Sequence, residues 1–215
     1  MATNNRYIYH ARISEAKFRQ IVKLFCLDLN AVQIAEISHL SRNSINKYLK
    51  ALRERIVELC DLEYKANGIK NFSTSPSIKM QQIPNEKPNK KNNSAIFGII
   101  HKDKHIYTQV LPNFISDEIN QVLTGKKNLT DLRFGDLLDV FDCLVDIGHG
   151  KYLLINGKSG HGVNSHRFNS VEGFFGYSKQ RLLNINYKDD KIFKFHLKES
   201  EFRFNNDRKK LIELY

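Results

Sequence analysis

Two segments near the C-terminal end, SHRFNSVEGFFGYSKQRL at 165–182 and FKFHLKESEFRFN at 193–205, carry most of the information about the fold. The first segment predicts a helix in which Glu172 and Lys179, seven residues apart, lie on one face. Enzymes that transfer phosphoryl groups with two metal ions need such a carboxylate to bind Mg²⁺, and a nearby lysine binds a phosphate. The segment therefore makes Glu172 a candidate metal ligand and Lys179 a candidate phosphate contact, with a solvated carboxylate and a solvated lysine on the helix surface as their alternatives.

The second segment predicts a helix that chiefly packs against a core. Phe195 and Phe202 are seven residues apart and so share one helical face. Lys194, Lys198 and Arg203 on the same helix are alternative DNA contacts, but the packing role is favoured.

Upstream, strands and helices alternate. SAIFGIIHKDKHIYTQVL at 94–111 has β-branched and aromatic residues on both sides of a polar tip, which predicts a β-hairpin. The pattern that follows predicts a helix at 115–123, a strand at 131–135, a helix at 137–145 and a strand at 151–155. Strands first, followed by alternating strand and helix, favour an α/β layer.

The N-terminal part predicts a helix-turn-helix unit. Apolar residues at Phe18, Ile21, Val22 and Phe25 mark a first helix of about three turns. The spacing of apolar residues over 31–49 fits a helix pair, in which Ser41 would cap the second helix.

That second helix would present side chains suited to base edges and phosphates in a major groove. They are Arg42, Asn43, Asn46, Lys47 and Lys50. The alternative is an ordinary three-helix bundle with a solvated basic face.

Composition supports a polyanionic partner. The formal net charge is +11 for 215 residues, and a protein with such an excess of basic residues most often binds nucleic acid. No apolar run has the length of a membrane span, and the first residues have no apolar signal core, so we expect a cytoplasmic protein associated with the nucleoid. Three scattered cysteines lack the pairing of a zinc ribbon.

The two C-terminal segments resemble the end of the catalytic domain in ISXO-like insertion-sequence transposases of the DDE class, which have a pattern close to HxNGIExFWxxxK followed by HLKExEFRFN. FGDLLDVFDCLVDIG at 134–148 is similar to the segment that holds the second acid of that family, and this alignment implies Asp136 as the second acid and Glu172 as the third. The resemblance also implies Lys179 as a phosphate contact. Asn169 is a further candidate metal ligand, with a helix N-cap as its alternative role.

The first acid of the family has no counterpart. The matching place holds NGIKNFSTSPS at 67–77, and Glu86 is the only acidic residue between Tyr64 and Lys102. Because a metal pair needs about three carboxylates, this difference from the family pattern predicts impaired catalysis. Asp61 and Glu63 are the nearest substitutes, but both lie in the predicted tail of a helix.

Together these observations predict an α/β protein, with an RNase H-like catalytic domain preceded by an all-α helix-turn-helix domain. The expected division is a DNA-binding domain at 1–63, a linker with a degenerate first strand at 64–94, and the catalytic domain at 95–215.

The resemblance implies a transposase that binds element ends and uses two Mg²⁺ or Mn²⁺ ions for DNA cleavage and strand transfer. Double-stranded DNA, at transposon ends and target, would be the partner, with a homodimer on DNA as one option. The alternatives are a non-catalytic DNA-binding relic or regulator of transposon ends and, with less support, a structure-specific nuclease on the same fold.

Overall fold

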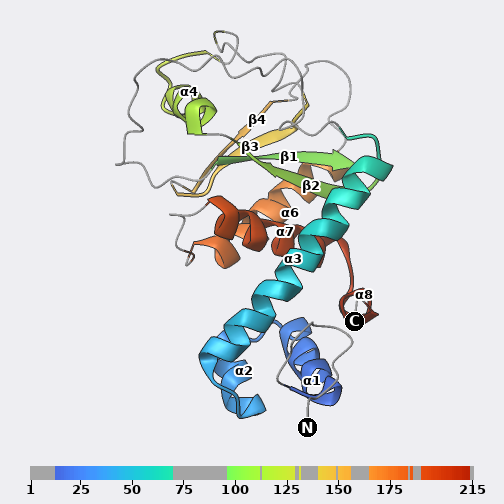
Figure 1. The fold of residues 1–215 in the computed structure, drawn as a ribbon. Coiled ribbons are helices and arrows are strands. Elements are labelled where there is room, and N and C mark those ends of the chain that lie inside the picture. The colour runs from blue at the N-terminus through green and yellow to red at the C-terminus, as the bar shows by residue number, and fades with distance from the viewer. Residues whose placement is uncertain are drawn as a thin grey trace.

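The computed structural model describes most of the chain as helices and strands around one antiparallel sheet (Figure 1). The described residues are 13–69, 96–111, 113–128, 131, 140–148, 150–155, 165–183, 185 and 190–213. The helices are α1 (Glu15–Cys26), α2 (Ala31–Ser38), α3 (Arg42–Ala66), α4 (Asn113–Leu123), α6 (Ser165–Leu182), α7 (Asp190–Asn205) and α8 (Arg208–Glu213). The strands are β1 (Ile96–Lys102), β2 (His105–Val110), β3 (Cys143–Asp146) and β4 (Lys151–Leu154).

Each of the first three helices begins at a polar side chain that accepts backbone N–H groups. Ser14 caps α1, Asn30 caps α2 in a capping box with Gln33, and Ser41 caps α3 by accepting the N–H of Ser44 at 3.2 Å. The predicted first helix and the predicted cap at Ser41 are both confirmed. These caps set where the short turns between the first three helices end.

α3 belongs to both halves of the molecule. Its first part packs on α1 and α2 through a core that includes Ile45 and Leu52. Its last part reaches the sheet, where Tyr64 joins a second core with Ile96 and Ile100. At 25 residues α3 is about 37 Å long, and Figure 1 shows it running from the N-terminal helices to the sheet. The expected domain boundary at residue 63 therefore falls inside a continuous helix.

β1 and β2 form the predicted hairpin. Lys102 pairs with His105, and the two residues between them, Asp103 and Lys104, have φ angles of 50° and 66°. Positive φ at both turn residues is the geometry of a two-residue hairpin turn whose twist matches that of the strands. The prediction from the polar tip is confirmed.

The sheet has the order β2-β1-β3-β4, and every pair is antiparallel. α4 covers one face, and α6 and α7 cover the other (Figure 1). The helix expected at 137–145 is wrong at its described C-terminal end, because Cys143–Val145 belongs to β3. These residues pair with β1 on one side and β4 on the other. The local spacing of apolar residues does not reveal this pairing, because it depends on other segments of the chain. The protein is thus mixed α/β, and the RNase H-like assignment stays a prediction.

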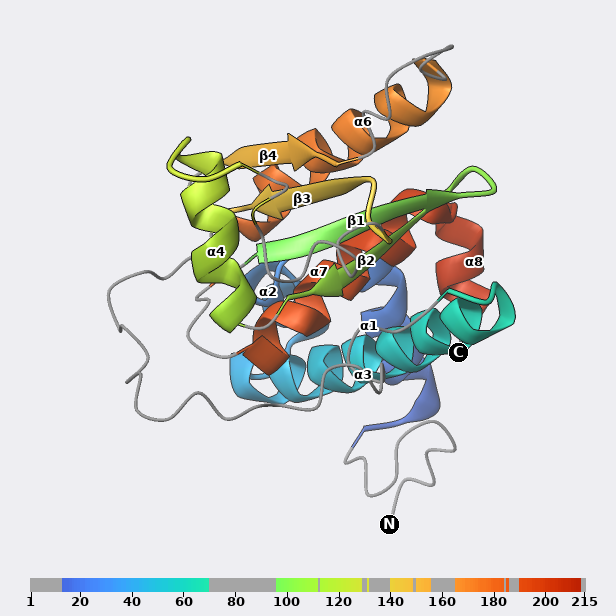
Figure 2. The ribbon, with the colours of Figure 1, turned by 90° about the horizontal axis from the view of Figure 1, so that it is seen from above.

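α7 closes the open edge of β2 with side chains. Asn205 accepts the N–H of Ile106 at 2.8 Å and donates to its carbonyl at 2.6 Å. Glu201 accepts the N–H of Thr108 at 2.7 Å, and Tyr64 of α3 donates to the Thr108 carbonyl at 2.6 Å. Unpaired strand edges invite pairing with other chains, so this edge is protected without a further strand. Figure 2 shows α7 running along β2.

The charged residues of α7 are mostly internal. Lys198 is 4% exposed and binds Glu201 at 2.7 Å, while Arg203 binds Glu199 at 2.8 Å. The predicted packing role of this helix is confirmed, and the alternative DNA contacts at Lys198 and Arg203 are wrong because both side chains are committed to buried carboxylates.

Glu199 is the centre of a buried charge cluster. It is 2% exposed and binds Arg53 of α3 at 2.7 Å, Arg181 of α6 at 2.9 Å and Arg203 of its own helix. Although burial alone would raise it, these arginines lower the pKa of Glu199 to about 2. We call Glu199, the three arginines and the nearby Asp28 the arginine junction.

His196 predicts how stability depends on pH. Burial, and then the charge of Arg53, lower the pKa of His196 from 6.5 to about 4, against the opposing charge of Glu199. The unfolded chain therefore takes up this proton at a higher pH than the folded chain, and stability falls as pH falls from about 6.5 to 4. At pH 4.5 the loss should reach about 2 kcal/mol relative to pH 7.

The measurement is urea unfolding at pH 7 and pH 4.5 for the parent protein and for His196→Gln. The variant should lose about 2 kcal/mol less over this interval. An equal loss in both proteins would show that other groups cause the acid sensitivity.

Candidate DNA-binding and catalytic site

The first turns of α3 present one polar face to solvent. All five residues predicted to contact DNA are exposed, while Ile45, Tyr48 and Leu49 between them are buried. With 3.6 residues per turn, positions 42, 43, 46, 47 and 50 fall on one side of the helix. We call Arg42, Asn43, Asn46, Lys47 and Lys50 the α3 polar face.

The turn before α3 holds this face in place. α2 ends at Ser38, and His39 follows in the left-handed conformation with φ 54°. Three residues, His39 to Ser41, then separate α2 from α3, which fits the turn length of a helix-turn-helix motif. Ile34 of α2 and Ile45 of α3 are fully buried in the same core, so the two helices are fixed against each other.

Glu172 lies on α6 and faces the sheet. Tyr152 of β4 donates its hydroxyl to Glu172 Oε1 at 2.6 Å, and its ring packs on Phe175 at 4.8 Å between centroids. The hydrogen bond to the Glu172 carboxylate raises the pKa of Tyr152. One carboxylate oxygen is therefore held by a phenol.

Lys179 reaches toward the same side of α6. Its Nζ lies 5.7 Å from the centroid of the Phe175 ring, and a Cβ added to Gly150 would lie 3.0 Å from it. Phe175 thus has the Glu172 partner Tyr152 and the Lys179 ammonium as neighbours. The sequence predicted Glu172 and Lys179 as neighbours on α6, but neither Tyr152 nor Gly150 had any local signal.

The side chains of the other two predicted metal ligands, Asp136 and Asn169, lie outside what the structure describes. Asp136 lies outside the described residues. The backbone of Asn169 is inside α6, which begins at Ser165, so its alternative role as an N-cap is wrong. Its side chain lies outside what the structure describes.

The side chains that the structure describes form no cluster of metal ligands. Within the ranges given above, no three Asp, Glu, His or Cys side chains are grouped closely enough to hold a metal ion. Asp61 pairs with Lys194 at 3.6 Å and Glu63 with Lys210 at 3.5 Å, so both proposed substitutes for the first acid are engaged in surface ion pairs. Glu172 is the one predicted metal ligand whose side chain is placed.

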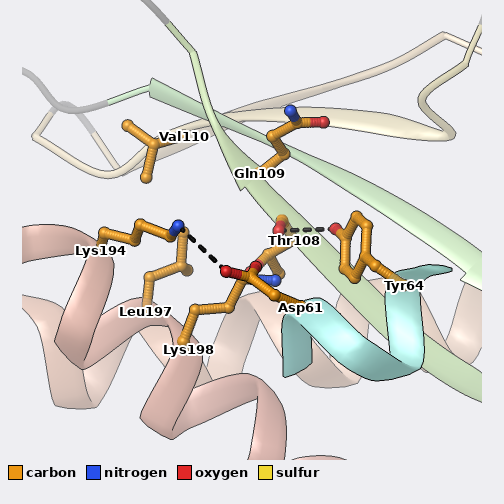
Figure 3. Close-up of a pocket in the computed structure, with 8 residues that line it drawn as sticks. All are labelled: Asp61, Tyr64, Thr108, Gln109, Val110, Lys194, Leu197 and Lys198. Carbon is orange, nitrogen blue, oxygen red and sulfur yellow. Dashed lines mark hydrogen bonds and ion pairs between the residues drawn. The ribbon is translucent and has the colours of Figure 1, made fainter. Parts of the chain in front are cut away.

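A small pocket lies elsewhere, between α3, β2 and α7 (Figure 3). Its lining residues are Asp61, Tyr64, Thr108, Gln109, Val110, Lys194, Leu197 and Lys198. The Lys194 to Asp61 ion pair spans it, and Lys198 Nζ lies 4.2 Å from the centroid of the Tyr64 ring. Asp61, a possible substitute for the first acid, lines it together with Lys194 and Lys198, two of the alternative DNA contacts predicted from the sequence.

Comparison with known proteins gives a transposase-like relationship. A 101-residue stretch is 28% identical to an "Uncharacterized transposase-like protein" of Haemophilus influenzae, covering 47% of this chain and 81% of the relative. No family model matches the chain. No solved structure matches it.

None of the described helices has the length and apolar character needed to cross a lipid bilayer.

Proposed function

We propose that this protein is a transposase-like protein that recognises double-stranded DNA at the ends of a mobile element through the α3 polar face. The observation that carries the proposal is the exposure of all five residues of that face on a helix fixed by a capped turn. Arg, Lys and Asn are the residue types that pair with base edges and phosphates in a major groove. The similarity to a transposase-like protein supports the biological setting.

Electrostatics favour the same partner. The chain has a formal net charge of +11, and several of its carboxylates are used inside the molecule to neutralise buried cations, as Glu199 and Glu201 do. The α3 polar face contributes Arg42, Lys47 and Lys50 as cations for phosphate neutralisation. Because phosphate contacts release counterions, binding should weaken steeply as salt rises.

The second candidate function adds DNA cleavage and strand transfer in an RNase H-like, DDE-class site with two Mg²⁺ or Mn²⁺ ions. Glu172 and Lys179, which share the Phe175 side of α6, favour it. In this proposal Asp136, Glu172 and Asn169 are metal ligands and Lys179 a phosphate contact. A non-catalytic binder of element ends is the competing candidate, which the missing first acid favours.

Asn46→Ala tests the recognition proposal. A bidentate contact from Asn to adenine contributes about 1 to 3 kcal/mol of discrimination, so the preference for end DNA over unrelated DNA should fall by a factor of about 5 to 150. The measurement is the pair of dissociation constants for labelled duplexes with and without the element's own end, at several salt concentrations.

The matched control is Arg55→Ala, which removes an exposed cation from α3 outside the polar face. It should leave the preference unchanged. If Asn46→Ala and Arg55→Ala keep the same preference as the parent protein, α3 does not read the sequence. Incubation of the same duplexes with Mg²⁺ or Mn²⁺, using Glu172→Gln as comparator, separates a cutting protein from a binding one.

A further inference from the structure

The turn between α1 and α2 is tied directly to the end of α6. Arg181, in the last turn of α6, donates one N–H to the Asp28 carboxylate and another to Glu199 Oε1 at 2.9 Å. Asp28 lies in the α1–α2 turn in the left-handed conformation, with φ 65°. The two segments are 153 residues apart in sequence.

The same junction holds α1 and α3. Arg53 of α3 donates to Glu199 at 2.7 Å. Arg203 of α7 donates to the carbonyl of Phe25 in α1 at 2.8 Å, and its guanidinium lies 4.4 Å from the centroid of the Phe25 ring. The arginine junction therefore connects α1, the α1–α2 turn and α3 with α6 and α7.

The planar shape of the guanidinium group restricts how the joined segments can move. A guanidinium is planar and donates in fixed directions, so one that binds two carboxylates at once has little freedom to rotate. Arg181 follows Lys179 by two residues and lies on the same helix as Glu172. Fixing Arg181 thus fixes the helix that carries the predicted catalytic side chains relative to the helices that read DNA.

We propose that Asp28 and Arg181 are positioning residues that hold α6 at one fixed offset from the α3 polar face. This offset would determine which part of a bound duplex lies against the Glu172 side of α6. That use of the offset rests on the proposed function, whereas the offset itself is a property of the protein alone.

The first experiment measures the offset without DNA. Spin labels are attached to cysteines introduced at Glu36 of α2, which is exposed, and at Gly176 of α6, where an added Cβ meets nothing within 4 Å. Cys26, Cys60 and Cys143 are buried, and the parent chain with no introduced cysteine shows whether they react. Electron spin resonance then gives the distribution of distances between the labels.

Asp28→Asn is the decisive variant, because Asn tolerates the left-handed backbone and replaces the carboxylate with a neutral amide of the same shape. Arg181→Lys is the second, since lysine keeps the charge but lacks the planar fork. Both should at least double the width of the distance distribution. Glu58→Gln, which removes the carboxylate of the exposed Arg55 pair, should leave it narrow. Equal widths in all four proteins would overturn the proposal.

The second experiment asks where bound DNA lies. An iron chelate attached to the cysteine at position 176 cleaves nearby sugars, and the parent protein should cut an end duplex at a few adjacent nucleotides. Asp28→Asn should spread these cuts over at least twice as many nucleotides at saturating protein. A narrow spin-label distribution together with cuts at random positions would contradict end recognition and leave the fixed offset standing. An unchanged cut pattern in Asp28→Asn would overturn the role of the offset in placing DNA.

Discussion

Replacing Glu199 with alanine should lower the free energy of unfolding by about 3 to 5 kcal/mol. The carboxylate is 2% exposed and is bound by Arg53, Arg181 and Arg203 at 2.7 to 2.9 Å. Without it, three guanidinium groups would face one another in a largely buried space. Removing one member of a buried charge cluster is costly because the others cannot regain their hydration. Urea unfolding at pH 7, followed by circular dichroism, measures the change.

Glu58→Ala is the matched control for Glu199. It makes the same substitution in a helix, in an ion pair whose side chains are both more than half exposed. Exposed pairs of this kind contribute about 0.5 kcal/mol or less. A Glu199→Ala protein as stable as Glu58→Ala would mean that water or a rearranged carboxylate replaces Glu199.

The low pKa of Glu199 predicts how its contribution to stability depends on pH. Because its pKa is lowered to about 2 in the folded protein, its contribution is fully present above about pH 4.5. The contribution is lost as pH falls from about 4.5 to 2. Glu199→Ala should therefore differ least from the parent protein at the acid end of this range.

Gly98→Ala should destabilise the protein by about 3 kcal/mol, through overlap with a buried ring. A Cβ at position 98 would lie 2.2, 2.4 and 2.6 Å from three carbons of Phe141, which is fully buried. The ring cannot move away freely because it is packed in the core on the α4 side of the sheet. Thermal and urea unfolding both measure the effect.

Two further variants separate overlap from a general effect of losing glycine. Gly176→Ala, where the added Cβ meets nothing within 4 Å, should stabilise α6 by up to about 1 kcal/mol. Phe141→Ala removes all three overlapping carbons, so combining it with Gly98→Ala should cost less than the sum of the two single changes. Simple additivity would contradict the overlap.

The elements that the sequence predicted best are those with local signals. The spacing of apolar residues predicted α1, α4 and α7, and a capping serine predicted the start of α3. The polar tip at Asp103 and Lys104 predicted the hairpin, because two-residue turns demand special residues. β3 was missed at Cys143–Val145, because a short apolar run fits a buried strand or a helix equally well, and its partners decide between them.

The residues of the candidate site also differ in whether a local signal in the sequence could predict them. The α3 polar face could be predicted, because exposure of a helix face follows from the apolar residues between its members. Glu172 and Lys179 could be placed on one helix from their spacing alone. Tyr152 could not be predicted as the partner of Glu172, because nothing local in either segment specifies a hydrogen bond between β4 and α6.

The amino-acid sequence by itself predicted most of the described helices, the hairpin, the short turn between α2 and α3 and the basic character of the chain, because these depend on neighbours within a few residues. Only the tertiary structure decided what the charges of FKFHLKESEFRFN do. Glu199 binds arginines, whereas Glu201 and Asn205 accept backbone N–H groups from the edge of β2. Arg203 binds the buried Glu199 carboxylate and the carbonyl of Phe25 near the end of α1. A charged residue in a helix has the same local pattern whether it faces water or a buried partner, and the packing of distant segments makes that choice.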